Sequence, residues 1–77
     1  MDDREKLIEL LKEINDEVDF ENETALVDDG LIDSLELTEI IAGLNTLFGV
    51  RIPAKDIEPE NFNSADAILE LVNRYRG

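Results

Sequence analysis

Ser34 is the residue of this sequence best suited to take part in covalent chemistry, because the usual catalytic side chains are missing. The sequence contains no histidine and no cysteine. This excludes a histidine general base, Ser–His and Cys–His nucleophile pairs, disulfides, and zinc ligation by imidazole or thiolate. The only three lysines, Lys6, Lys12 and Lys55, lie in no context that indicates burial. We therefore expect no intrinsic enzyme activity, and the Ser34 hydroxyl remains as the candidate.

Acidic residues are abundant, but their spacing does not predict a catalytic or metal site. Asp28 and Asp29 could in principle serve as a glycosidase-type carboxylate pair. Such a pair needs a substrate cleft, which a 77-residue chain has little material to build. A calcium loop of the EF-hand type needs a glycine after its alternating acids, and neither the 16–28 nor the 56–61 stretch has that glycine in place. A weak divalent-ion site stays open, and a dedicated metal site is not expected.

The residues around Ser34 place it at the start of a predicted helix. Apolar side chains recur there at steps of three and four residues, which is typical of a helix with one buried face. They are Leu37, Ile40, Ile41, Leu44, Leu47 and Phe48. Asp33 followed by Glu36 indicates a capping box, and Gly49 marks the helix end. Because Asp33 takes the capping position, we expect a free Ser34 hydroxyl near the positive end of the helix dipole, where a phosphate is favoured. A plain capping serine is the alternative.

Leu35 is predicted to be exposed beside this serine. At 100° per residue it lies almost opposite the apolar stripe, on the outward face with Glu39 and next to Glu36. A single exposed leucine is ordinary. Its position next to a free serine at a helix start favours a docking spot for another protein.

The segment before Ser34 is predicted to contain one helix and one long loop. The helix spans about Asp3 to Val18, since apolar residues again recur at helical spacing. These residues are Leu7, Leu10, Leu11, Ile14 and Val18. From Phe20 to Asp29 no periodicity is sustained, so we expect a loop that adds Leu26 and Val27 to the core.

After Gly49 we expect an extended connector, a short helical turn and a last helix. The turn lies around Ala54–Ile57 or near Pro59–Phe62, and Asn63 or Ser64 caps the last helix. The apolar stripe of that helix is Ala65, Ile68, Leu71, Val72 and Tyr75. The sequence thus predicts a single all-α domain over residues 1–77, a small four-helix bundle with a long first loop and a short third helix.

The charge distribution indicates which partners the protein attracts. Twenty acidic residues oppose seven basic ones, for a net charge of −13, and no basic residue lies between Lys12 and Arg51. Such a field repels nucleic acid and anionic membranes and attracts basic protein surfaces. The alternative is a solvated, self-repelling surface that only keeps the protein soluble. No apolar run approaches the ~20 residues that span a bilayer, and no signal peptide is recognisable. We expect a cytoplasmic protein.

Three motifs, in order along the chain, resemble the acyl carrier protein family. The run Asp29-Gly30-Leu31-Ile32-Asp33-Ser34-Leu35-Glu36-Leu37 resembles its Asp-Ser-Leu signature. The run Phe48-Gly49-Val50-Arg51-Ile52-Pro53 resembles its phenylalanine-glycine-x-x-isoleucine-proline connector, and Phe62 followed by Ser64 resembles the entry to its last helix. Together these motifs span most of the chain.

The resemblance implies an acyl-carrier-like bundle in which Ser34 receives 4′-phosphopantetheine from coenzyme A. A phosphopantetheinyl transferase would attach it, and its thiol would hold an acyl or aminoacyl group as a thioester. Partners would dock at Asp33, Leu35, Glu36 and Glu39. They would include an acyl-activating ligase, or acyltransferase or synthase enzymes, with basic docking surfaces. The resemblance implies a non-catalytic monomer that binds no nucleic acid and does not insert into membranes.

The cargo stays open at this point. Carriers of fatty acid synthesis usually keep acids farther along the helix, where this chain has Ala42, Gly43, Asn45 and Thr46. Gly-Leu-Ile-Asp-Ser is closer to D-alanyl and other pathway-specific carriers. Fatty acyl, malonyl-type, aminoacyl and D-alanyl cargo all remain, as do fatty acid, polyketide, nonribosomal peptide and D-alanylation pathways. Two other classes also remain: an acidic helical interaction module in which Ser34 is inert, and a divalent-ion-binding helical protein.

Overall fold

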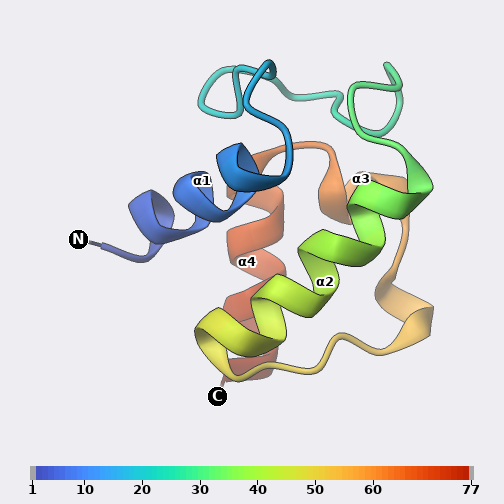
Figure 1. The fold of residues 1–77 in the computed structure, drawn as a ribbon. Helices are drawn as coiled ribbons and strands as arrows, with labels where there is room; N and C mark the ends of the chain where they lie inside the picture. The colour runs from blue at the N-terminus through green and yellow to red at the C-terminus, as the bar shows by residue number, and fades with distance from the viewer. Residues whose placement is uncertain (1, 77) are drawn as a thin grey trace.

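The fold is all-helical over the residues that the computed structural model describes, 2–76 (Figure 1). Four α-helices and one short 3₁₀ turn follow one another along the chain, and no strand lies between residues 2 and 76. They are α1 (Asp3–Ile14), α2 (Ser34–Phe48), η1 (Ala54–Asp56), α3 (Pro59–Phe62) and α4 (Ala65–Arg76). The predicted bundle, with its long first loop and short third helix, is confirmed. Both proposed positions of the short turn are helical, as η1 and α3.

The helices pack around α4, which contacts α1, α2 and α3, while α1 also packs against α2. In Figure 1 the loop from α1 to α2 arches over the top of the bundle, and the connector from α2 to α3 passes below it. One apolar core joins all these elements. Its buried members are Leu7, Ile8, Leu11, Phe20, Leu26, Ile32, Ile40, Leu44, Val50, Phe62, Ala65, Ile68, Leu71 and Val72. No helix within residues 2–76 is long and apolar enough to cross a membrane.

The first helix is shorter than the sequence predicts, and it ends at Ile14 instead of near Val18. The reason lies in Asn15, whose backbone is extended and whose Oδ1 accepts a hydrogen bond from the N–H of Glu17 at 3.1 Å. A side chain that binds a nearby backbone N–H offers an alternative to the helical bond. The predicted long loop is confirmed, and it contributes Leu26 and also Phe20 to the core.

Two residues of the predicted apolar stripes are in fact exposed, Leu47 on α2 and Tyr75 on α4. Both lie in the last turn of their helices. Tyr75 instead donates a hydrogen bond from its hydroxyl to the carboxylate of Asp56 in η1. The cap of α4 is Ser64, because Ser64 Oγ accepts a hydrogen bond from the N–H of Ala67 at 3.0 Å. Asn63, the other candidate, has a different role described below.

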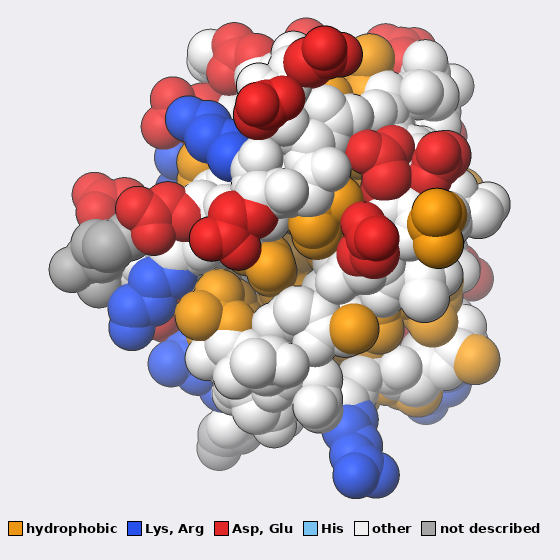
Figure 2. Space-filling view, in the orientation of Figure 1, with side chains coloured by type: hydrophobic (Ala, Val, Ile, Leu, Met, Phe, Trp, Pro, Cys, Tyr) orange, Lys and Arg blue, Asp and Glu red, His pale blue; other side chains and the backbone are white. Residues whose placement is uncertain are grey.

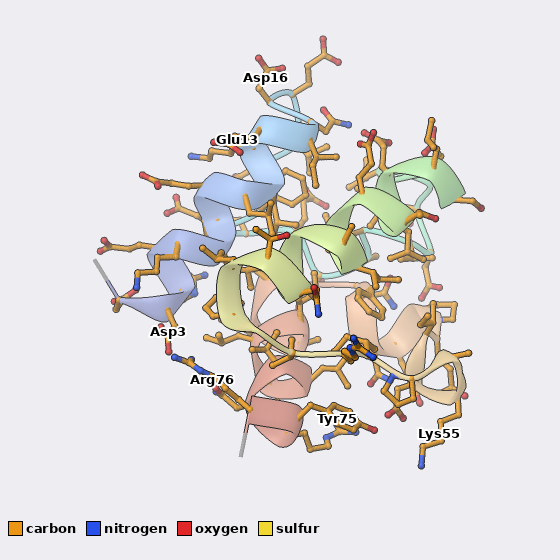
Figure 3. All side chains as sticks on the ribbon, turned by 60° about the horizontal axis from the view of Figure 1, so that its bottom comes forward. Asp3, Glu13, Asp16, Lys55, Tyr75 and Arg76 are labelled. Carbon is orange, nitrogen blue, oxygen red and sulfur yellow. The ribbon has the colours of Figure 1, made fainter. Side chains whose placement is uncertain are left out.

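Charged side chains connect the two ends of the chain across α1 and α4. Arg4 binds Asp66 at 2.9 Å. Arg76 pairs with Asp3, and Figure 3 shows these two side chains meeting. The guanidinium of Arg76 also lies 5.2 Å from the centre of the Phe48 ring. Exposed ion pairs of this kind contribute little stability, about 0–1 kcal/mol each. Arg4 also donates a hydrogen bond to the carbonyl of Glu21 at 3.3 Å, so these two arginines join the start of α1 to the long loop and to both ends of α4.

Candidate functional site

Ser34 is the first residue of α2, and Asp33 caps that helix as predicted. The Oδ1 of Asp33 accepts a hydrogen bond from the N–H of Glu36 at 2.8 Å. In return, the Oε1 of Glu36 accepts one from the N–H of Asp33 at 3.1 Å. This reciprocal capping box satisfies two backbone donors of the helix start without any contribution from Ser34.

The Ser34 side chain is exposed, and within residues 2–76 its hydroxyl forms no hydrogen bond. The carbonyl of Ser34 accepts a bond from Thr38 Oγ1 at 3.0 Å, so the backbone of the first turn is held in place. The hydroxyl is therefore available for reaction, and it lies where the helix dipole and first-turn N–H groups favour an attached anion.

The predicted docking residues surround this serine. Leu35 is 69% exposed, more than any other large apolar side chain among residues 2–76. Glu39 is exposed and Glu36 is half-buried, as its capping bond requires. Figure 2 shows acidic side chains gathered on the upper part of the molecule, where the long loop and the start of α2 lie, and Lys and Arg along the left and lower edges. An apolar side chain within an acidic surface is the composition that suits a basic partner.

The loop that leads into Ser34 is held by two sets of hydrogen bonds. The carbonyl of Leu26 accepts bonds from the N–H groups of Leu31 at 2.9 Å and Ile32 at 3.1 Å, which closes the turn. Gly30 has a positive φ of 69°, which a glycine adopts without strain. Ile32 is buried, so the chain enters α2 from a fixed point in the core.

The second set comes from Asn63, a residue that the sequence suggested only as a possible cap of the last helix. Its Oδ1 accepts bonds from the N–H of Val27 at 3.0 Å and of Asp28 at 3.1 Å. Its own carbonyl accepts a bond from Leu26 at 2.9 Å. Asn63 thus links the junction of α3 and α4 to the serine loop. Nothing in the local pattern indicated this contact, because the partners lie 35 and 36 residues apart.

The site contains no group of side chains suited to a metal ion. Among residues 2–76, no three histidine, cysteine, aspartate or glutamate side chains come together in a way that could hold one. The chemistry available at the site is that of a free hydroxyl at a helix start, beside an exposed leucine and several carboxylates.

Comparison with known proteins shows which family the chain belongs to. Residues 4–72 match the family described as "Phosphopantetheine attachment site". The chain belongs to this family of carrier proteins. The carrier is also 32% identical over 78 residues to the D-alanyl carrier protein of Streptococcus sanguinis, covering 99% of this chain and 98% of that protein. The same identity and coverage hold for the D-alanyl carrier proteins of Streptococcus thermophilus and Streptococcus gordonii. No solved structure shows a significant match.

The family membership confirms the predicted carrier function with a covalently attached phosphopantetheine group. Proteins of this family are non-catalytic carriers, and they interact with biosynthetic enzymes that act on their cargo. The structure offers a place that fits such a group: an exposed hydroxyl without an internal partner, at the N-terminus of a 15-residue helix whose cap is already filled.

Proposed function

We propose that Ser34 is the attachment residue and that a phosphopantetheinyl transferase adds 4′-phosphopantetheine to it from coenzyme A. The observation that supports this most strongly is the division of roles between two neighbours. Asp33 closes the capping box, and Ser34 keeps an exposed hydroxyl in the first turn. If Ser34 were the cap, its oxygen would be engaged with the helix backbone.

In phosphopantetheine transfer the carrier supplies the nucleophile and stabilises the attached phosphate. Ser34 Oγ attacks the pantetheine-bearing phosphorus of coenzyme A, the P–O bond of its pyrophosphate breaks, and adenosine 3′,5′-bisphosphate leaves. The hydroxyl proton goes to a base on the transferase, since the chain has no histidine. The first-turn N–H groups and dipole of α2 stabilise the phosphate that becomes bonded to Oγ. Once attached, the group supplies a terminal thiol that holds the cargo as a thioester.

We propose that the partners dock on Leu35, Glu36 and Glu39, with Asp33 at the edge of the same surface. Leu35 is the apolar contact, and the glutamates attract basic surfaces of the transferase and of the enzyme that charges the carrier. Residues 1–77 act as one carrier domain, without insertion into membranes and without nucleic acid. The absence of cysteine agrees with work in the cytoplasm, and the net charge of −13 opposes self-association and favours a monomer.

For the cargo we propose an aminoacyl group, specifically D-alanine, delivered by an acyl-activating ligase. The support is the similarity to D-alanyl carrier proteins of three Streptococcus species, each 32% identical to this chain over nearly its whole length. The sequence agrees with it, since the Gly-Leu-Ile-Asp-Ser run resembles that group of carriers and the second half of α2 lacks acids.

The test uses mass spectrometry in two steps. The purified chain is incubated with coenzyme A and a broad-specificity phosphopantetheinyl transferase, and we expect one added phosphopantetheine, absent from Ser34→Ala. The modified chain is then offered D-alanine, L-alanine or a fatty acid with the matching ATP-dependent ligases. No mass gain in the first step would refute the attachment proposal. A gain there followed by charging with fatty acid alone would refute only the proposed cargo.

A further inference from the structure

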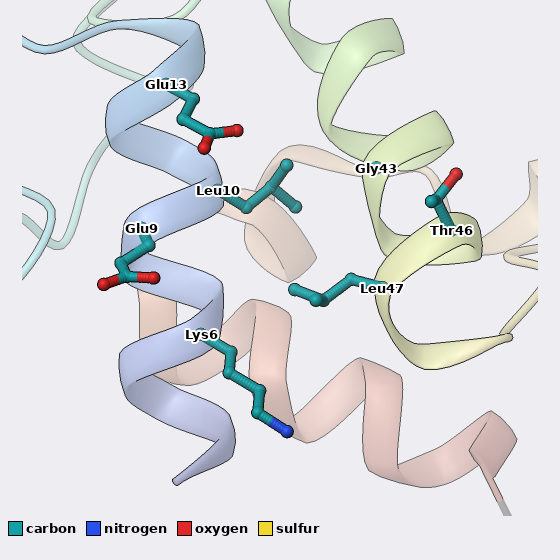
Figure 4. Close-up of a pocket in the computed structure, with 7 residues that line it drawn as sticks. All are labelled: Lys6, Glu9, Leu10, Glu13, Gly43, Thr46 and Leu47. Atoms are coloured by element: carbon teal, nitrogen blue, oxygen red, sulfur yellow. The ribbon is translucent and has the colours of Figure 1, made fainter. Parts of the chain in front are cut away.

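A groove between α1 and α2 lies apart from the surface beside Ser34 (Figure 4). It has a volume of about 550 Å³, and α1 and the second half of α2 line it. The lining residues are Lys6, Glu9, Leu10, Glu13, Gly43, Thr46 and Leu47. Gly43 and Leu47 follow Ser34 by nine and thirteen residues, which places them about 14 and 20 Å farther along the helix axis.

The floor of this groove is apolar, and the two helices that line it cannot move closer together. In Figure 4, Leu10 points from α1 toward Gly43, and Leu47 points from α2 toward α1. A Cβ atom at Gly43 would lie 2.6 Å from Leu10 Cδ1, so the helices already touch at this point. They cannot approach further to cover Leu47, which stays 40% exposed. The exposed leucine therefore results from the helix packing itself, and only another molecule can bury it.

The rim of the groove carries negative charge on the α1 side. Glu9 and Glu13 lie one turn apart and are exposed, and Figure 4 shows Glu13 directed toward the groove. Within residues 2–76 neither forms an ion pair. Like charges at this spacing destabilise a helix slightly, and a cation between them would relieve the repulsion. Lys6, at the other end of the rim, is the one basic residue among those lining the groove.

We propose that this groove is a second docking surface, which binds an amphipathic helix of the ligase that charges the carrier. The helix would place an aliphatic side chain against Leu10 and Leu47 and a lysine or arginine beside Glu13. A second copy of this chain is a poor occupant, because each copy carries a net charge of −13 and would oppose these acids with its own. This inference rests on the proposed function, since the ligase is part of it.

The position of the groove explains why the ligase, and not the transferase, would use it. An enzyme that reacts with Ser34 Oγ must place its active site at the start of α2, so it has no need to reach Leu47. An enzyme that reacts at the far end of the attached arm has its active site away from Ser34. It must then hold the body of the carrier by a broader surface. The groove provides that additional contact.

The experiment measures the affinity of the ligase for a chain that carries no phosphopantetheine. A D-alanine-activating ligase is titrated by calorimetry with the Ser34→Ala chain, then with the same chain carrying Leu47→Ser or Glu13→Lys. We expect the Kd to rise about tenfold for each. The matched control is Glu70→Lys, which makes the same charge change at an exposed glutamate on α4 and should leave the Kd nearly unchanged. In chains that keep Ser34, the rate of phosphopantetheine transfer should not respond to Leu47→Ser.

Each other outcome would overturn the inference in a recognisable way. If the Ser34→Ala chain binds the ligase with the same Kd with and without Leu47→Ser or Glu13→Lys, the ligase does not use the groove. An effect of Leu47→Ser only when Ser34 is modified would assign the groove to the cargo arm. If the unmutated chain sediments as a dimer and the Leu47→Ser chain as a monomer, the groove binds a second copy of the chain. Failure of phosphopantetheine transfer to the unmutated chain, which keeps Ser34, would refute the proposed function instead, and it is measured separately.

Discussion

Asn63 and Asp28 bind each other through both backbone and side chain. The Oδ1 of Asn63 accepts a hydrogen bond from the N–H of Asp28 at 3.1 Å, and the Nδ2 of Asn63 donates one to Asp28 Oδ2 at the same distance. Since Oδ1 also accepts from Val27, one amide group organises the loop that leads to Ser34. The contact joins the entrance of α4 to the entrance of α2, two places that no short-range motif connects.

Removing this amide should loosen the serine loop. Asn63→Ala leaves the N–H groups of Val27 and Asp28 without their partner, and a lost partner at a partly buried donor costs about 1–3 kcal/mol. We expect a lower midpoint in urea and faster amide exchange at those two positions. Asn73→Ala, at an exposed asparagine on α4, is the control and should change neither. Unchanged exchange in the Asn63 variant would mean that the loop is held by other contacts.

Substitutions at Asp33 and Ser34 should have different effects, the first on stability and the second on phosphopantetheine transfer. Asp33→Ala removes the capping side chain of α2 and should destabilise the fold by about 1 kcal/mol. Ser34→Ala should abolish phosphopantetheine transfer and leave the thermal midpoint nearly unchanged, because the Ser34 hydroxyl binds nothing in the described chain, residues 2–76. Thermal melts and a transfer assay on both variants check this. A Ser34→Ala protein that melts like Asp33→Ala would make Ser34 a structural residue.

Leu35 should matter to partners and not to the fold. Because it is 69% exposed, Leu35→Ala should slow phosphopantetheine transfer at unchanged stability. The contrasting change is Ile40→Ala, five positions later on the same helix and fully buried, which should cost about 2–5 kcal/mol. Initial rates at two salt concentrations, paired with melts, measure both effects.

Glu39→Lys tests the electrostatic part of the same surface. The change should reduce the association rate, and added salt should shrink the defect because it screens exposed charges. A rate defect that is independent of salt would point to a direct steric effect of the lysine. Stopped-flow association with the transferase at low and high salt distinguishes the two.

Tyr75 offers a spectroscopic measure of how α4 is joined to η1. Its hydroxyl donates a hydrogen bond to the Asp56 carboxylate, and this bond raises the pKa of Tyr75 above its ordinary value of 10.0. The folded pKa exceeds the unfolded one, so the contribution to stability is present below pH 10 and is lost as the pH rises through the folded value. Tyr75 is the only tyrosine and the chain has no tryptophan, so an ultraviolet absorbance titration follows it alone. Asp56→Asn should lower the measured pKa.

Features that depend on neighbouring residues could be predicted from the sequence. The capping box of Asp33 and Glu36, the left-handed glycine at Gly49 and the exposed side of Leu35 all follow from local geometry within one helix. A capping box is formed by two residues three positions apart, and the apolar stripe of a helix shows which of its residues face outward. For that reason the local geometry at the start of α2, with Asp33 as cap and Ser34 and Leu35 exposed, was predictable, and so was the all-helical class.

Features that depend on contacts between distant segments of the chain could not be predicted and are seen only in the folded protein. Periodicity placed Leu47 and Tyr75 in the core, yet both are exposed. Leu47 faces a groove that α1 and α2 leave open, because Leu10 already lies against Gly43. The end of α1 at Ile14 was decided by the bond of Asn15 to Glu17, which competes with the next helical turn. The need for a glycine at position 43 is seen only in the folded chain, where Leu10 of α1 lies against it. The role of Asn63 is likewise seen only where it binds Asp28. Such contacts depend on the packing of the whole chain, because a residue's spacing along its own helix does not specify which distant side chain will meet it.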